Sequence, residues 1–143
     1  ASKIMHAAAA AINAGIMRGS LKEAVEYTKE REQGGRPVIN WSEVRMLLAN
    51  MAIKSKAAEL CVTQTCKAID ENLKDWGRTS IASTLHVHDL ACEVVTDGVQ
   101  LLGGNGYMKD YGQEKRYRDA RQVMALLGLA PLKKLALIKE IAG

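Results

Sequence analysis

Aromatic residues are scarce in this 143-residue sequence, which contains no phenylalanine, two tryptophans and four tyrosines. Because hydrophobic residues still make up 48% of the chain, its core must be built mainly from aliphatic side chains. Charged residues account for 25%, which is close to the globular average and excludes a wholly disordered chain. We therefore expect residues 1–143 to form a single domain.

Cysteines and long apolar runs are also few. Cys61, Cys66 and Cys92 are odd in number, lack a Cys-x-x-Cys spacing and lie in apolar helical patterns. We expect reduced core residues and a cytoplasmic location. No apolar run reaches the roughly 18–20 residues of a membrane-spanning helix, so no membrane span is expected. The opening residues, Ala1–Met5, lack an initiator methionine and a signal-peptide layout, and we expect a piece of a longer chain.

The charge of the sequence does not indicate a nucleic-acid-binding protein. Its 20 lysines and arginines are scattered among 16 acidic residues, which gives a formal net charge of +4. Nucleic-acid-binding domains gather basic residues on one face or in one block, so no nucleic-acid partner is expected. A mild positive excess suits an ordinary solvated surface and equally a protein that handles nucleotide phosphates.

Apolar residues recur at spacings of three and four, which predicts amphipathic helices. The first helix is expected from residue 4 to about 33, where Gly34, Gly35 and Pro37 break the chain. The second is expected after the N-cap residue Asn40 and ends near residue 74. The predicted apolar faces of these helices are Ile4, Ala8, Ala11, Ile12, Gly15, Ile16 and Gly19, and then Val44, Leu47, Leu48 and Met51.

The later helices are separated by glycine-containing turns. After a turn at residues 75–78, Thr79 or Ser80 can cap a third helix, which ends at the glycine-rich run 103–106. A fourth helix from about residue 114 is interrupted near residues 128–131 and resumes as a last segment with Pro131 in its first turn. The predicted apolar positions are Ile81, Leu85, His88, Cys92, Val95, Val99 and Leu102, then Val123, Met124 and Leu127, and finally Leu132, Leu135 and Ile138.

Short turns between long helices make neighbouring helices antiparallel. Strand-like alternation of apolar and polar residues is absent from the sequence. The sequence therefore predicts an all-α fold, namely an antiparallel four-helix up-down bundle with a short extra C-terminal helix.

Common catalytic and metal-binding patterns are missing. No glutamate has a histidine three residues later, which excludes the di-iron bundle pattern, and no metal site is expected. His86 and His88 are two residues apart and cannot share a helix face, and His88 is expected to be a hydrogen-bonded core residue rather than a ligand. Neither a Gly-x-Ser-x-Gly motif nor an evident cysteine–histidine pair supports nucleophilic catalysis.

Residues 99–107 read VQLLGGNGY, and residues 114–120 read EKRYRDA. These stretches closely resemble a signature of acyl-CoA dehydrogenases, which are flavoenzymes. Upstream, AVEYTKER at residues 24–31 and GRP at residues 35–37 resemble a second stretch of the same family. The resemblance covers nearly the whole chain and implies the C-terminal helical domain of such an enzyme. The family's N-terminal helical and middle β domains have no counterpart in these residues.

The resemblance implies that this domain helps to bind FAD. Arg31 corresponds to an arginine that reaches the FAD pyrophosphate of a neighbouring subunit. The residues corresponding to a run that lies against the ADP part of the same cofactor are Gln100, Leu101, Leu102, Gly103 and Gly104. A guanidinium can bind phosphate through two hydrogen bonds, and glycine lets the backbone approach a ligand. The alternatives are a surface salt bridge for the arginine and a simple helix end for the glycines.

The usual catalytic base of the family is missing. It is the glutamate of a Tyr-Glu-Gly-Thr segment, and Leu127 occupies its position here. Some members place the base on the first long helix, at the position of Met5. Neither side chain can accept the substrate's α-proton. The next residue, His6, is either a substitute base or an exposed helix residue.

Three functions remain open for the longer chain. The first is an FAD-dependent acyl-CoA dehydrogenase that forms an α,β double bond in an acyl-CoA thioester and uses an unusual base. The second is a flavin-binding or structural, oligomerisation subunit without dehydrogenation, and the third is an acyl-CoA dehydrogenase-like flavin monooxygenase. The resemblance also implies a homotetramer or homodimer and an electron-transfer flavoprotein as electron acceptor. The domain alone is expected to be inactive.

Overall fold

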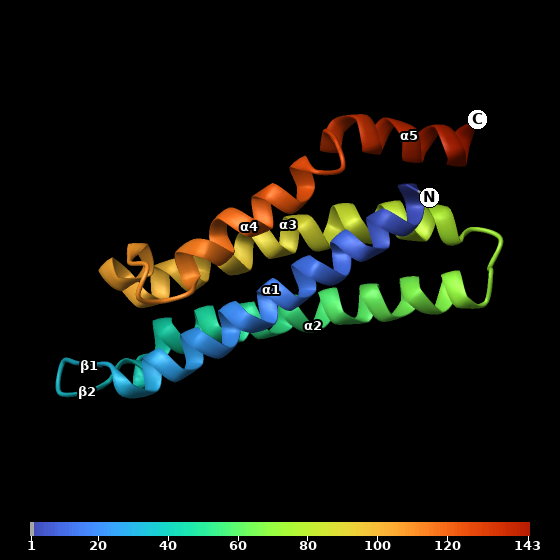
Figure 1. Ribbon diagram of the computed structural model, residues 1–143. Coiled ribbons are helices and arrows are strands. Elements are labelled where there is room, and N and C mark those ends of the chain that lie inside the picture. Colours follow the sequence, from blue (N-terminus) through green and yellow to red (C-terminus); the bar gives the residue numbers. More distant parts are fainter. Residues whose placement is uncertain (1) are drawn as a thin grey trace.

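The computed structural model of this chain describes residues 2–143. Within these residues the helices are α1 (Ser2–Glu30), α2 (Ser42–Asp70), α3 (Trp76–Leu102), α4 (Gln113–Ala125) and α5 (Ala130–Ala142). The first four run alternately up and down beside one another, and α5 bends away from the line of α4 (Figure 1). The predicted antiparallel four-helix bundle with a short extra C-terminal helix is therefore confirmed.

The chain reverses between α1 and α2 through a small hairpin that the sequence patterns did not predict. Strand β1 (Glu32–Gln33) pairs antiparallel with β2 (Arg36–Pro37). Gly34 and Gly35 form the loop with φ of +68° and +83°, which glycine adopts readily. The predicted chain break at these glycines is confirmed, but α1 ends at Glu30 and not near residue 33.

Other helix boundaries also differ from the prediction. Asn40 belongs to a short 3-10 turn, η1 (Val38–Asn40), and does not cap α2. Helix α2 ends at position 70, four residues before the predicted end, so the turn before α3 covers residues 71–75. Helix α3 therefore begins before Thr79 and Ser80, and neither residue caps it. Ser80 lies inside the helix and donates from its hydroxyl to the backbone carbonyl of Lys3 in α1, since a buried hydroxyl needs a partner.

The core lies where α1, α2 and α3 face one another and where α4 covers α3. Helix α1 packs most extensively on α3. Small side chains allow helix axes to approach closely, which suits a core that is poor in aromatic residues. Its buried members are Ala10, Met17, Ala24, Leu48, Met51, Ala58, Val87, Ala91, Val94, Val95 and Ala120.

The face of α1 that enters this core is opposite to the predicted one. Ile4 and Ile12 are 54% and 53% exposed, whereas the polar residues Ser20 and Thr28 are fully buried. Alanine occurs all around α1, so its apolar periodicity fits either face. Hydrogen bonds make the polar residues tolerable inside, as in the 2.7 Å bond from the Thr28 hydroxyl to the Ala24 carbonyl.

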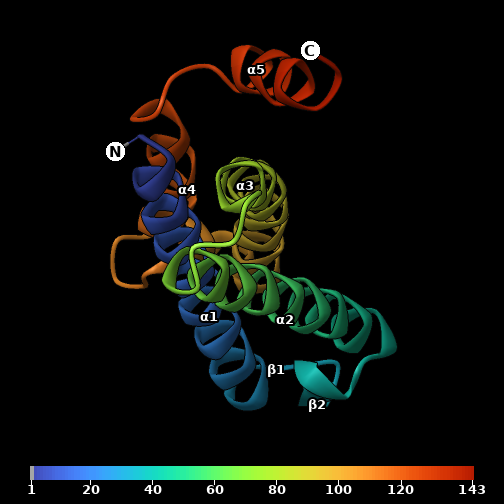
Figure 2. The same ribbon diagram turned by 90° about the vertical axis from the view of Figure 1, so that its right-hand side faces the viewer.

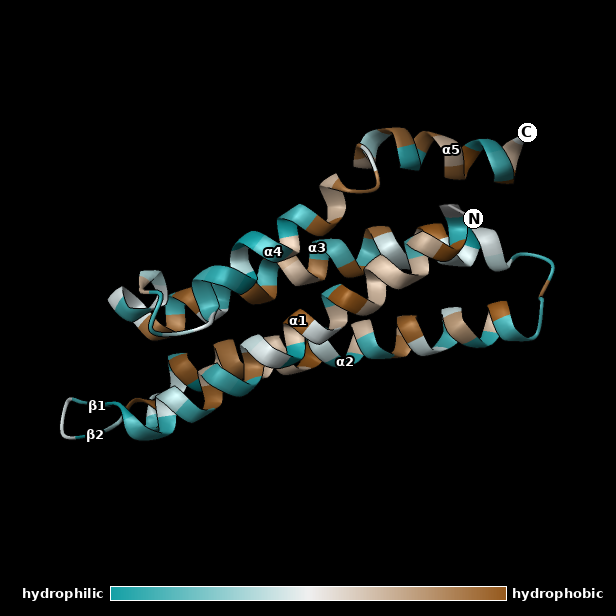
Figure 3. Ribbon diagram, in the orientation of Figure 1, coloured by the Kyte–Doolittle hydropathy of each residue, from teal (hydrophilic) through white to brown (hydrophobic). Residues whose placement is uncertain are grey.

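The apolar positions that the sequence predicts along α5 are largely exposed. Leu132, Leu135 and Ile138 are more than half exposed, and Figure 3 shows hydrophobic residues along this helix. Helix α5 contacts the bundle mainly through α3 and lies apart from α2 (Figure 2). Its buried residue is Lys133, whose amine donates to the Gly128 carbonyl at 3.2 Å. The predicted break between α4 and α5 is confirmed.

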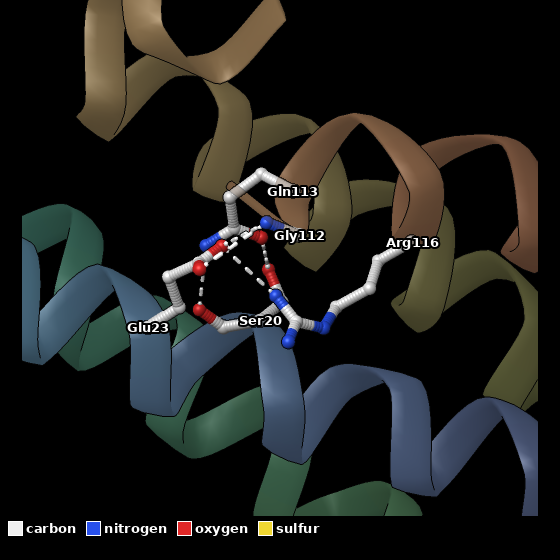
Figure 4. A network of polar contacts seen from close by, with 5 residues as sticks. All are labelled: Ser20, Glu23, Gly112, Gln113 and Arg116. Carbon is white, nitrogen blue, oxygen red and sulfur yellow. Dashed lines mark hydrogen bonds and ion pairs between the residues drawn. The ribbon is translucent and has the colours of Figure 1, made fainter. Parts of the chain in front are cut away.

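A network of polar contacts fastens the start of α4 to α1 (Figure 4). Ser20 Oγ donates to Gln113 Oε1 at 2.7 Å, and Gln113 Nε2 donates to the Ser20 carbonyl at 2.8 Å. One turn further along α1, Glu23 accepts from the Gly112 backbone N–H and from Arg116 Nη1, each at 3.0 Å. The reciprocal pair offsets the desolvation of two side chains that are fully buried.

Gly98→Ala in α3 should destabilise the fold, because Gly98 lies directly against this network. A Cβ at position 98 would overlap Ser20 Oγ and lie 2.8 Å from Gln113 Oε1. We expect urea unfolding to show a loss of about 1–3 kcal/mol, the usual cost of overpacking.

Gly15→Ala is the matched control for this substitution. Nothing lies within 4 Å of a Cβ built at this position in α1. Replacing a helical glycine there should raise the free energy of unfolding by about 0.5–1 kcal/mol. Equal effects at the two positions would contradict the packing argument.

Candidate functional site

An open groove of about 760 Å³ lies at the end of the bundle where α1 and α3 end and α2 begins. A groove of this volume is large enough for a cofactor or other small ligand. Every residue for which the sequence predicts FAD contact lines it. The full lining is Tyr27, Arg31, Gln33, Val38, Glu43, Val44, Leu47, Gln100, Leu101, Leu102, Gly103, Gly104, Asn105 and Met108.

Two charged residues line this groove, Arg31 and Glu43. The backbone N–H of Arg31 continues the α1 hydrogen-bond pattern by donating to the Tyr27 carbonyl. Its side chain is exposed and forms no ion pair with any residue that the structure describes, so the predicted alternative of a surface salt bridge is not seen within residues 2–143. The guanidinium is therefore available to an anion in the groove.

The glycine-rich run after α3 forms one wall of the groove as a 3-10 turn, η2 (Gly103–Tyr107). Gly103 has a φ of +58°, and a Cβ on Gly106 would overlap the Val99 carbonyl oxygen. The protein's own geometry therefore requires glycine at both positions. Gly104 is different, because its φ is not positive and nothing lies within 4 Å of a Cβ built there. Neither the backbone conformation nor the packing of the domain explains this glycine, which lines the groove.

Tyr27 ties this wall to α1. Asn105 Nδ2 donates to the Tyr27 hydroxyl at 2.8 Å, and the Tyr27 ring meets Tyr111 edge to face at 5.5 Å between centroids. Tyr27 lies one turn before Arg31, so one face of α1 carries the groove's cation and also holds the glycine turn. The sequence patterns did not single out this contact, because its partners are 78 residues apart.

The positions at which the family resemblance expects a base lie outside this groove. Met5 is 57% exposed at the opposite end of α1, and Leu127 is half-buried in the turn between α4 and α5. His6 is only 8% exposed, so its interpretation as an exposed helix residue is wrong. The reason is the packing of α1 on the start of α3, where the Thr84 hydroxyl donates to the His6 carbonyl at 2.6 Å.

A cysteine–histidine pair is present in α3, contrary to the sequence-based prediction. Cys92 Sγ lies 3.6 Å from His88 Nε2, and both residues are half-buried. Burial lowers the pKa of His88 and raises the pKa of the Cys92 thiol. A neutral thiol beside a neutral imidazole is a weak nucleophile, so the pair is a structural contact. Its spacing of four residues on a helix was the signal that could have revealed it.

The three cysteines are free thiols. Cys66 is exposed on α2, so its predicted core position is wrong, while Cys61 and Cys92 are half-buried. Within residues 2–143 no group of three or more histidine, cysteine or acidic side chains is arranged to hold a metal ion. None of the helices that the structure describes combines the length and hydrophobicity needed to cross a membrane.

The fold defines a helical-bundle domain with an open groove at one end, and comparisons identify its family. Residues 3–130 match the family model described as acyl-CoA dehydrogenase, C-terminal domain. A probable acyl-CoA dehydrogenase of Mycobacterium leprae is 35% identical over 127 residues, which cover 89% of this chain and 33% of the relative. A subunit of a caffeyl-CoA reductase–Etf complex of Acetobacterium woodii is 30% identical over 123 residues, with 86% and 32% covered.

The fold is also found in a solved structure of a named enzyme. Butyryl-CoA dehydrogenase from Megasphaera elsdenii matches with a TM-score of 0.91 and 27% identity, over 96% of this chain and 36% of that one. The chain belongs to the acyl-CoA dehydrogenase family and forms the C-terminal domain, which confirms the resemblance. It spans about a third of the length of the relatives named above. The cofactor contacts of its groove residues stay a prediction.

Acid should destabilise the domain through His88. Burial is the main cause of its lowered pKa, which Asp89 opposes and which Arg121 and Lys133 reinforce. Below the ordinary value of 6.5 the unfolded chain therefore binds a proton before the folded chain does. This part of the stability is present above pH 6.5 and is lost as the pH falls through the folded pKa.

His88→Gln should flatten the dependence of the unfolding free energy on pH in the window below pH 6.5. Urea unfolding at a series of pH values measures this slope. His86→Gln, on the exposed side of the same helix, controls for the loss of an imidazole in general. A slope that His88→Gln leaves unchanged would show that His88 is not the titrating group.

Proposed function

We propose that this chain supplies one wall of an FAD site in an acyl-CoA dehydrogenase-type oxidoreductase, which removes hydrogen from the α and β carbons of an acyl-CoA thioester. The observation that carries the proposal is the convergence of Arg31 with residues 100–104 in one groove, although they are far apart in the sequence. Gly104 supports it further, because its missing side chain serves neither the backbone conformation nor the packing of the domain.

Each kind of lining residue suits a different part of the cofactor. Arg31 can bind the pyrophosphate through two parallel hydrogen bonds, and the backbone at Gly103 and Gly104 can approach the ligand closely. Val44 belongs to the apolar part of the groove, which suits an adenine ring, and the Glu43 carboxylate can accept hydrogen bonds from ribose hydroxyls. When bound, FAD supplies the hydride-accepting chemistry, which the side chains of this domain lack.

The proposal includes an acyl-CoA substrate, a homotetramer or homodimer, and an electron-transfer flavoprotein as electron acceptor. Similar proteins support the first and the last of these, because one is a butyryl-CoA dehydrogenase and another is a subunit of a complex with Etf. A neighbouring subunit could close the groove, which is open to solvent in the single chain. A cytoplasmic location is proposed because free thiols suit a reducing compartment.

The missing base favours a second candidate function. Leu127 and Met5 cannot take up the α-proton, and loss of a general base commonly slows a reaction by about 10²- to 10⁴-fold. A subunit that keeps the fold for flavin binding or assembly, without dehydrogenation, needs no such residue. An acyl-CoA dehydrogenase-like flavin monooxygenase needs none either, although no residue of the groove selects that chemistry.

One experiment on the complete natural protein that carries this sequence separates these functions. Its bound-flavin spectrum is recorded, and a panel of acyl-CoA thioesters is then added without oxygen. Bleaching of the flavin would support the dehydrogenase. Flavin that stays bound and oxidised with every thioester would favour the subunit without dehydrogenation. If the flavin, once reduced, also takes up oxygen, the result would favour the monooxygenase. Absence of flavin would contradict the proposed FAD site.

Gly104→Leu should weaken FAD binding without destabilising the protein. Its side chain would enter open space in the groove and occupy volume that the cofactor needs. We expect the dissociation constant for FAD to rise at least about tenfold, a loss of roughly 1.4 kcal/mol, with no fall in the melting temperature of the flavin-free protein. Gly15→Leu, at an open helical glycine outside the groove, is the matched control. Equal binding by both variants would exclude this groove as the FAD site.

Leu127→Glu tests whether the family's base position still works. If the wild type binds flavin but is limited by the missing base, a carboxylate there should raise acyl-CoA-dependent flavin reduction by about 10²-fold. Leu126→Glu places the same group on the exposed neighbouring residue and should leave the rate unchanged. No increase with Leu127→Glu would mean that the absence of a base at this position does not limit the reaction. Anaerobic stopped-flow absorbance measures the rate.

A further inference from the structure

Four residues on one face of α1 or at its end, Ser20, Glu23, Tyr27 and Arg31, follow one another at spacings of three, four and four. This spacing places them in line along the helix axis. The first three hold the segment that runs from η2 into α4, and the fourth lines the groove. The line therefore connects a structural anchor with the proposed cofactor site.

The held segment runs antiparallel to this line. From Ser20 to Tyr27 along α1, the partners come from successively earlier positions in the segment. Ser20 pairs with Gln113, Glu23 with Gly112, and Tyr27 with Asn105. The next position in this spacing is Arg31, which directly follows the end of α1, and the next part of the segment is the glycine turn at residues 103–104. Both line the groove. Arg31 and the glycine turn thus lie where the pairing of α1 with the segment would continue into the groove.

The register has little freedom at its anchored end. Ser20 and Gln113 are fully buried and hydrogen bonded in both directions. Gly98 leaves no room for a Cβ beside them, since a Cβ there would overlap Ser20 Oγ. Because these positions are tightly packed, they allow little local adjustment.

Glu23 holds the segment through its carboxylate. Its carboxylate accepts from the Gly112 backbone N–H at 3.0 and 3.2 Å and from Arg116 Nη1 at 3.0 Å. Hydrogen bonds to an ionised carboxylate are stronger than those between neutral groups, such as the bond of Tyr27 with Asn105. Glu23 also holds the backbone of the segment directly, which a contact between two side chains does not do.

We propose that Glu23 is a positioning residue of the groove. Through Gly112 and Arg116 it fixes the register between α1 and the glycine turn, and so sets the placement of Arg31 relative to Gly104 on which nucleotide binding depends. Glu23 is not among the residues that line the main groove, so in this proposal it acts through Gly112 and Arg116 and not by contact with the cofactor. The inference rests on the proposed function of this groove as an FAD site.

The test compares Glu23→Ala and Glu23→Gln in the complete natural protein, depleted of flavin and titrated with FAD. Flavin fluorescence gives the dissociation constant, and thermal unfolding gives the stability of each variant. Glu23→Gln keeps an acceptor for the Gly112 N–H but removes the charge that pairs with Arg116. We expect Glu23→Ala to raise the dissociation constant about tenfold or more, as loss of a supporting hydrogen-bond partner commonly does. Glu23→Gln should recover most of this loss.

Two controls separate positioning from general destabilisation. Thr84→Val removes a buried hydroxyl that joins α3 to α1 far from the groove, and it should lower the melting temperature with FAD binding within about twofold of the wild type. Glu26→Ala removes a neighbouring glutamate of α1 that lines the same smaller groove of about 370 Å³ as Glu23. It should leave both quantities nearly unchanged.

The outcomes distinguish failure of this inference from failure of the proposed function. If the wild type binds no FAD, the proposed function fails and the positioning role fails with it. If the wild type binds FAD and Glu23→Ala binds it as tightly, only the positioning role is overturned. It is also overturned if Thr84→Val weakens binding as much as Glu23→Ala at equal loss of stability, because Glu23 would then act only through stability.

Discussion

The close approach of α1, α3 and α4 around Gly98 is the constraint on which the rest of this structure depends. Two buried polar side chains, Ser20 and Gln113, fill the space that a larger residue at position 98 would need. Beyond this point α1 continues to the hairpin, and residues 103–113 join the end of α3 to the start of α4. The groove lies between these two segments, and their relative position is fixed where the three helices meet around Gly98.

Polar contacts at this crossing specify geometry in a way that apolar packing does not. Buried donors and acceptors must be paired, so the Ser20–Gln113 pair and the Glu23 carboxylate each admit few arrangements. Aliphatic residues of similar size tolerate sliding of one helix along another more easily. Burying these polar groups costs desolvation free energy, and their pairing holds the segment 103–113 in a defined position.

Periodicity and turn residues were enough to predict the bundle, because four long helices with short turns have few ways to pack. They could not predict which face of α1 is inside, since alanine surrounds that helix and the buried polar residues Ser20 and Thr28 look like surface residues. The hairpin was missed because its strands are two residues each, although Gly34–Gly35 is a recognisable two-residue loop. The groove residues were found only through resemblance to a family, and their convergence required the fold.

The groove residues suit the binding of a dinucleotide, whereas Leu127 and Met5, at the two positions where the resemblance expects a base, cannot accept a proton. Arg31 and the open glycine at 104 lie in a groove that the rest of the domain holds in register. Leu127 and Met5 lie outside that groove, so their replacement need not disturb it. The proposed cofactor groove and the two expected base positions therefore lie in separate parts of the bundle. Leucine and methionine at the base positions are compatible with an intact groove, so flavin binding and dehydrogenation must be measured separately.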